Sequence, residues 1–169
     1  MTGSRDEERA ERVTDSSTRN EAGRNEAGRN GAAQETGMPF GSLSVLVVED
    51  ESFTRMVLAK MLAGLGVKAV HQAADGAAAL AAVDAHEPDL ILCDVEMQPM
   101  DGFGFVRALR ASPDSRRSTL PVVFMSSRVD GDREAAARAS GADAVLAKPA
   151  TPATLRDVLG IRRPAIPFA

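Results

Sequence analysis

Residues 90–102 read Leu90-Ile91-Leu92-Cys93-Asp94-Val95-Glu96-Met97-Gln98-Pro99-Met100-Asp101-Gly102, and the architecture that we predict for the chain is built around them. The apolar residues at the start are typical of a strand buried on both faces, as in a parallel sheet. The run ends abruptly at Asp94 and a Pro/Gly loop, so this carboxylate lies where a buried strand opens to solvent. Ligands bind at that end of the strands in open α/β sheets. Asp94 is therefore a candidate nucleophile, metal ligand or helix cap.

Three more segments typical of buried strands end in polar side chains. Residues 44–48 run into Glu49-Asp50-Glu51, residues 122–125 into Ser126-Ser127, and residues 144–147 into Lys148-Pro149. If the four strands are parallel, their carboxyl ends bring acids, a hydroxyl and an ammonium group to one edge of the sheet. A short, more polar strand at 67–72 suits an outer position in that sheet.

Helical patterns separate the strands. Five alternations of strand and helix predict an α/β fold, in which helices cover both faces of a parallel sheet. We expect Ser52 to cap the first helix and Pro152 to lie in the first turn of the last. Residues 112–119 are predicted to form a polar loop. The predicted helices cover residues 52–65, 75–87, 102–111, 130–140 and 152–159.

The composition is that of a globular protein, with 44% hydrophobic and 26% charged residues among 169. Twenty basic and 24 acidic side chains give a formal net charge of −4, which argues against direct binding to nucleic acid. No run approaches the roughly 18 apolar residues of a membrane span, and the N-terminus lacks an apolar signal core. We therefore expect a cytoplasmic protein without membrane insertion. The single cysteine, Cys93, excludes an internal disulfide.

The two ends of the chain differ in composition from its centre. Residues 1–40 are rich in Arg, Glu, Asn, Gly and Ser, contain few large apolar residues, and repeat Asn-Glu-Ala-Gly-Arg at 20–24 and 25–29. Such a segment cannot bury enough surface to offset its chain entropy. We predict a disordered polar tail at 1–40, one folded domain at 43–160, and a short C-terminal tail at 161–169.

The polar residues at the predicted sheet edge suit phosphoryl transfer. A carboxylate such as Asp94 can accept a phosphoryl group and form an aspartyl phosphate. Glu49 and Asp50, together with Asp94, form the kind of oxygen ligand set that Mg²⁺ prefers. Lys148 and Ser126 offer an ammonium and a hydroxyl group to phosphoryl oxygens. Each residue alone is typical of a helix cap or a solvated loop, so the prediction depends on the joint pattern.

In this order and at these separations, the segments resemble the response-regulator receiver domain of two-component signalling over about residues 43–160. The resemblance implies a flavodoxin-like, five-stranded parallel sheet with the strand order 2-1-3-4-5. The segments that carry it are 47–51, 94–97 with 100–102, Ser126, 141–143 and 148–149.

The resemblance also implies roles for the residues at the sheet edge. Asp94 would be the phosphoacceptor, and Ser126 and Lys148 would contact the phosphoryl group. Mg²⁺ would be bound by Glu49, Asp50, Asp94 and the backbone carbonyl of Glu96.

The phosphoryl group would come from a sensor histidine kinase or a histidine phosphotransfer protein. The nine residues after Gly160 are too few for an effector domain, so we expect a stand-alone regulator. Such a protein would signal by contacting an unidentified downstream protein or by passing phosphate along a relay. It would be a switch that catalyses only its own phosphorylation and dephosphorylation, not a metabolic enzyme.

Some positions depart from the usual pattern. Pro99 is displaced by one residue relative to the common order Met-Pro-x-Met-Asp-Gly. Val145 stands at a switch position, where most relatives carry a Tyr, Phe or His that moves inward together with the residue matching Ser126. Because valine has one stiff rotor and no ring, we expect weaker or differently routed coupling. We also expect Glu96 and Arg128, each two residues beyond the acid or the serine, to pair across the site and modulate dephosphorylation.

Two other functions fit parts of the pattern. A receiver-like interaction module that is not phosphorylated would keep the fold, and Val145 leaves room for it. A phosphatase of the haloacid-dehalogenase type also uses an Asp after a strand, but it requires a second Asp two residues later, where this chain has Glu96. The absence of a Gly-x-Gly-x-x-Gly turn after any predicted strand disfavours dinucleotide binding.

Overall fold

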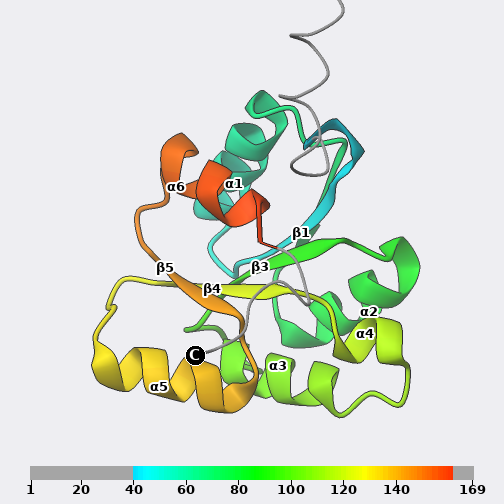
Figure 1. The fold of residues 1–169 in the computed structure, drawn as a ribbon, viewed down its shortest axis with the longest axis vertical. Helices are drawn as coiled ribbons and strands as arrows, with labels where there is room; N and C mark the ends of the chain where they lie inside the picture. The colour runs from blue at the N-terminus through cyan, green and yellow to red at the C-terminus, as the bar shows by residue number, and fades with distance from the viewer. Residues whose placement is uncertain (1–39, 162–169) are drawn as a thin grey trace, which may run out of the picture. The chain divides into compact units, whose positions relative to one another are not determined.

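Five short strands form one parallel sheet in the computed structural model, which describes residues 40–161 (Figure 1). The strand order is β2-β1-β3-β4-β5, so β3 lies at the centre, between β1 and β4. This order and the helices on both faces confirm the predicted flavodoxin-like fold. The strands are β1 Ser44–Val48, β2 Ala69–Ala73, β3 Leu90–Asp94, β4 Val122–Ser126 and β5 Ala144–Ala147.

Alternate residues of the strands supply two separate layers of hydrophobic core. In β1, Val45 and Val47 face one layer, while Leu46 and Val48 face the other. All five residues of β3 are buried, as expected for a central strand covered on both faces. The uninterrupted apolar runs in the sequence therefore reflect burial on two sides of the sheet.

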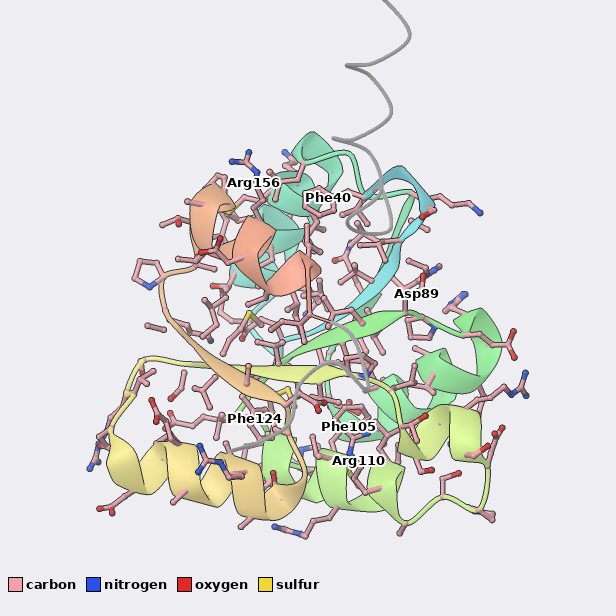
Figure 2. The ribbon with its side chains drawn as sticks, in the orientation of Figure 1. Phe40, Asp89, Phe105, Arg110, Phe124 and Arg156 are labelled. Atoms are coloured by element: carbon pink, nitrogen blue, oxygen red, sulfur yellow. The ribbon has the colours of Figure 1, made fainter. Side chains whose placement is uncertain are left out.

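The helices divide between the two faces of this sheet. On one face lie α1 and α6, whose buried residues Leu62 and Leu155 join the same core layer. Residues of α2, α3 and α5 join the other layer, in which Phe105 and Phe124 are the largest side chains (Figure 2). The bounds are η1 Phe40–Ser42, α1 Ser52–Gly64, α2 Gly76–His86, α3 Gly102–Arg110, α4 Ser115–Ser118, α5 Gly131–Ser140 and α6 Pro152–Leu159.

Three local predictions were wrong. The carboxylate of Glu51, not the hydroxyl of Ser52, caps α1 by accepting from the backbone N–H groups of Phe53 and Thr54. The segment predicted as a polar loop contains the short helix α4, which is capped by Asp114. The second strand begins at Ala69, two residues later than predicted. All three errors concern element ends or a single helical turn, where hydrophobic periodicity carries no information.

The predicted tails at 1–40 and 161–169 lie outside the described residues, except for Phe40 and Ile161. Both of these pack, partly buried, against the core layer of α1 and α6. The longest described helix, α1, has 13 residues, and none within residues 40–161 has both the length and the hydropathy of a bilayer span.

Candidate phosphoryl-transfer site

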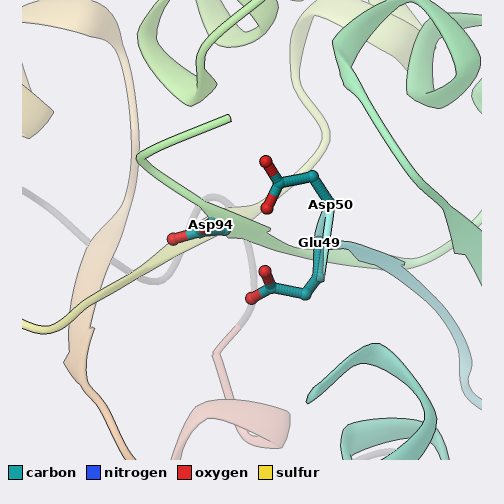
Figure 3. A group of neighbouring side chains, drawn as sticks. All are labelled: Glu49, Asp50 and Asp94. Carbon is teal, nitrogen blue, oxygen red and sulfur yellow. The ribbon is translucent and has the colours of Figure 1, made fainter. Parts of the chain in front are cut away.

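Three carboxylates from two neighbouring strands meet at the carboxyl edge of the sheet. Glu49 and Asp50 directly follow β1, and Asp94 is the last residue of β3, which pairs with β1 in parallel. One oxygen atom from each carboxylate lies within 4.8 Å of the others (Figure 3). Glu49 and Asp94 are buried, whereas Asp50 is exposed. The structure thus brings together the three acids that the sequence predicted at one edge.

Lys148 supplies the positive charge that the two buried acids need. Its Nζ lies 2.8 Å from Glu49 Oε2 and 3.1 Å from Asp94 Oδ1. Lys148 follows β5 at the edge of the sheet, and its backbone N–H donates to the Ser126 carbonyl at the end of β4. The ammonium therefore spans from β5 to the β1 and β3 acids, across the end of β4.

Burial and the ion pairs shift the pKa values of this cluster. Burial raises the pKa of Glu49 above its ordinary value, and the Asp94 charge adds to the rise, although the hydrogen bond from Lys148 opposes it. Burial would lower the pKa of Lys148, but its hydrogen bonds to Glu49 and Asp94 outweigh this effect and raise that pKa. Lys148 therefore stays protonated, and the acid cluster retains one fixed positive charge.

The Ser126 hydroxyl lies at the same edge but is engaged within its own loop. It donates to the Arg128 carbonyl at 2.7 Å and accepts from the Arg128 backbone N–H at 3.2 Å. Ser126 is buried at the end of β4, which pairs with β3. To donate to a group on Asp94, this hydroxyl must first give up its hydrogen bond to the Arg128 carbonyl.

The loop after β3 folds back closely onto the strand end. The backbone N–H of Gly102 donates to the carbonyl of Val95 at 2.9 Å. A Cβ atom at Gly102 would lie 2.5 Å from the Asp94 carbonyl oxygen, which no larger residue could avoid. The structure thus explains both residues of the Asp101-Gly102 pair. Gly102 is required by this close approach, and the Asp101 side chain caps α3 by accepting from the Gly104 N–H.

The predicted pairing of Glu96 with Arg128 is wrong. Glu96 Oε1 bonds Nη2 of Arg133 at 3.1 Å, while Arg128 Nε bonds Asp130 Oδ2 at 2.7 Å. Arg128 meets an acid only two residues away in its own loop, so it does not reach across the site. The sequence analysis missed Arg133, although an arginine in the first turn of a helix, against the helix dipole, was a usable signal.

Val145 lies beside Phe124 in the β4–β5 register and packs, partly buried, against the core layer of α3 and α5. With Glu134, Ala137 and Arg138 of α5 it lines a shallow pocket of about 170 Å³. The pocket is lined by residues of β5 and α5, at a position where the sequence has a valine and no aromatic ring.

The strand ends that form this site all lie within a match to one known protein family. The family model described as "Response regulator receiver domain" matches residues 45–160, which include every strand end described above. The chain belongs to the response regulator receiver domain family. Receiver domains bind Mg²⁺ at an acidic pocket, and the oxygen atoms of Glu49, Asp50 and Asp94 provide a hard, anionic donor set that fits this ion.

Individual relatives agree with the receiver assignment. A probable chemotaxis protein CheY of Rhizobium etli is 34% identical over 111 residues, which cover 64% of this chain and 83% of that protein. The transcriptional regulatory protein PdtaR of Mycobacterium tuberculosis is 37% identical over 105 residues, or 62% of this chain, but the match spans only 49% of that protein. The crystal structure of Vibrio cholerae CheY4 superposes with a TM-score of 0.64 at 33% identity, covering 69% of this chain and 95% of that one.

Proposed function

We propose that this receiver domain is phosphorylated on Asp94 in a two-component phosphorelay. The observation that supports the proposal best is the contact of one ammonium group, that of Lys148, with both Glu49 and Asp94 at the mouth of the central strand. A buried carboxylate beside a second acid costs stability even when a cation contacts both, and such groups are concentrated at functional sites. Proteins of this family are generally signalling switches, not metabolic enzymes.

The proposed reaction uses the side chains of the chain as follows. A carboxylate oxygen of Asp94 attacks the phosphorus of a phosphohistidine, the P–N bond breaks, and the imidazole leaves. Lys148 balances the charge that spreads over the phosphoryl oxygens in the transition state. The Ser126 hydroxyl, once released from the Arg128 carbonyl, donates to one of those oxygens.

Glu49, Asp50, Asp94 and the Glu96 carbonyl would hold Mg²⁺. When bound, the ion would supply the remaining positive charge to the phosphoryl oxygens. Asp50 is the exposed member of the set, so it would complete the ion's ligands from the solvent side.

The direct test is incubation of the protein with acetyl phosphate and Mg²⁺, followed by intact mass spectrometry. We expect a gain of one phosphoryl group in the parent and in Asp157→Asn, a control that makes the same charge change on the exposed side of α6. Asp94→Asn should gain nothing. A parent that stays unmodified would favour the interaction module, and steady turnover of a phosphoester would favour the phosphatase.

The partners follow from this chemistry. We propose a sensor histidine kinase or a histidine phosphotransfer protein as the phosphate source. The output would be contact with a downstream protein or transfer of phosphate along the relay. Because the side chain at 145 is a valine, we propose that this output does not depend on the motion of an aromatic ring. A cytoplasmic location stays a prediction.

A further inference from the structure

Arg133, in the first turn of α5, connects this helix to the loop and helix that follow β3. Its Nη2 bonds Glu96 Oε1 at 3.1 Å, and its Cζ lies 5.9 Å from the centre of the Phe103 ring. The arginine side chain is only 20% exposed, although that of Glu96 is 68% exposed. The guanidinium is therefore held in place beneath a carboxylate that projects into solvent.

The backbone dipole of α5 does not favour a cation at this position. The first turn of a helix prefers negative charge, and Asp132 and Glu134 follow that preference on either side of Arg133. The contacts outside the helix explain the arginine instead. The Phe103 ring under the guanidinium meets the Phe124 ring edge-on, with centroids 5.2 Å apart. Phe124, labelled in Figure 2, is fully buried in β4, so the Phe103 ring connects the arginine to the core.

The position of Glu96 makes this support relevant to the acid cluster. Glu96 lies two residues after Asp94, and with Asp101, Phe103 and Arg133 it lines an open pocket of about 390 Å³. Glu49, Asp50 and Asp94 already place three acids at the same sheet edge. An unpaired Glu96 carboxylate would add a further negative charge at the mouth of a site that must admit an anionic phosphodonor.

We propose that Arg133 is a positioning residue for phosphoryl transfer, which neutralises Glu96 and holds its carboxylate against α5. This inference rests on the proposed function and concerns the regulation of that same site. The arginine acts on the entry of anions through Glu96 and does not touch the reacting atoms.

The first readout is the rate of phosphorylation by acetyl phosphate at saturating Mg²⁺. We expect Arg133→Gln to lower this rate by roughly twofold to fivefold, the range of an exposed charge pair. Glu96→Gln alone should raise the rate, and the double variant Arg133→Gln/Glu96→Gln should return it to the parental value. In about 1 M salt, where the screening length is about 3 Å, the four rates should converge.

The second readout is the affinity for Mg²⁺, measured by calorimetry without any phosphodonor. Added negative charge repels an anionic donor but attracts a cation, so Arg133→Gln should bind Mg²⁺ more tightly by a similar factor while it is phosphorylated more slowly. A purely structural role for Arg133 predicts weakening of both, because a disordered loop would bind neither ligand well. The opposite signs separate the two explanations.

Two controls complete the design. Arg107→Gln makes the same charge change at an exposed position of α3 and should leave both readouts at the parental values. Arg133→Lys keeps the charge and should recover most of the rate. If Arg133→Gln does not fold, Glu96→Gln alone still tests the proposal, because the exposed Glu96 side chain can be changed without disturbing the core.

The outcomes are distinct for the two proposals. If the parent is phosphorylated but Arg133→Gln equals it, or if Glu96→Gln does not restore the double variant, the role of Arg133 is overturned and phosphorylation of Asp94 stands. If Arg133→Gln also binds Mg²⁺ more weakly, the electrostatic role is overturned. If the parent takes up no phosphoryl group, the proposed function fails and this inference fails with it.

Discussion

The Lys148 ammonium contacts two buried carboxylates, those of Glu49 and Asp94. Lys148→Met would leave both acids facing each other without a cation. Breaking a buried ion pair costs about 3–5 kcal/mol, and the partial exposure of Lys148 lowers our expectation to roughly 1–3 kcal/mol. Urea unfolding at pH 7 in the presence of EDTA measures this loss. The exposed Lys68→Met is the control and should change the unfolding free energy by less than about 0.5 kcal/mol. Equal losses in the two variants would contradict a stabilising role of Lys148 between the two acids.

Single residues also mark the limits of what the sequence could predict. The sequence predicts the positions of Asp94, Glu49, Asp50 and Lys148 because each lies at the carboxyl end of a strand or just beyond it, and parallel strands bring these ends together. The partner of Glu96 was not predictable in the same way. The position of Arg128 in the chain suggested a pairing across the site, but its side chain bonds Asp130 in its own loop. Arg133 is 37 residues from Glu96, so only the packing of α5 brings them into contact.

At the scale of elements, Arg110 joins α3 to the end of α4 and to the turn between α5 and β5. Its guanidinium donates to the carbonyls of Ser118 and Gly141 and to the carboxylate of Asp143, at 2.9–3.1 Å (Figure 2). Arg110→Met would leave the buried Asp143 without this charged partner, so we expect a loss of about 2–4 kcal/mol in unfolding free energy. Denaturant unfolding tests this against Arg107→Met, one turn earlier and exposed, for which we expect no more than about 0.5 kcal/mol. Similar values for the two variants would show that the three bonds contribute little.

The edge strand β2 and the end of α2 share a titratable contact. The rings of His71 and His86 stack with centroids 4.0 Å apart, and His71 Nε2 lies 3.1 Å from Ser44 Oγ. Burial, together with the charge of His86, lowers the pKa of His71 below its ordinary value of 6.5. As pH falls below 6.5, the unfolded chain binds the proton before the folded protein does, so this contribution to stability is present above 6.5 and is lost on acidification.

The change in unfolding free energy between about pH 7.5 and pH 5.5 should therefore shrink in His71→Gln relative to the parent. Urea unfolding of both proteins at the two pH values measures it. An unchanged pH dependence would assign the acid sensitivity to other groups.

Elements differed in how far the sequence could define them. The inner strands β1, β3 and β4 were predictable because burial on both faces requires continuous apolar runs. Helices such as α1 and α3 were predictable because their apolar residues repeat about every 3.6 residues. The helix α4 has four residues and no buried one, so it left no such pattern. Its single turn follows from the Asp114 cap and from contacts such as that of Arg110 with Ser118, which arise only after the chain has folded.

For the whole molecule, the acid cluster links folding to metal binding. Without a cation, three carboxylate oxygens within 4.8 Å repel one another, and a ligand that binds only the folded state stabilises it by mass action. Mg²⁺ at a hundredfold excess over its dissociation constant should add about 2.7 kcal/mol, which raises the melting temperature by several degrees. Asp50→Asn removes one exposed acid, so it should be at least as stable as the parent in EDTA and less stable than the parent in Mg²⁺.

This reversal of order is the informative result, because a variant that merely weakens the fold would be less stable in both conditions. Calorimetric melting of both proteins, each with EDTA and with Mg²⁺, measures it, and Asp157→Asn should shift with Mg²⁺ as the parent does. Equal shifts in the parent and Asp50→Asn would mean that Asp50 does not hold the ion. The metal would then depend on the two buried acids alone, of whose two negative charges Lys148 offsets one, and the exposed acid would serve another purpose.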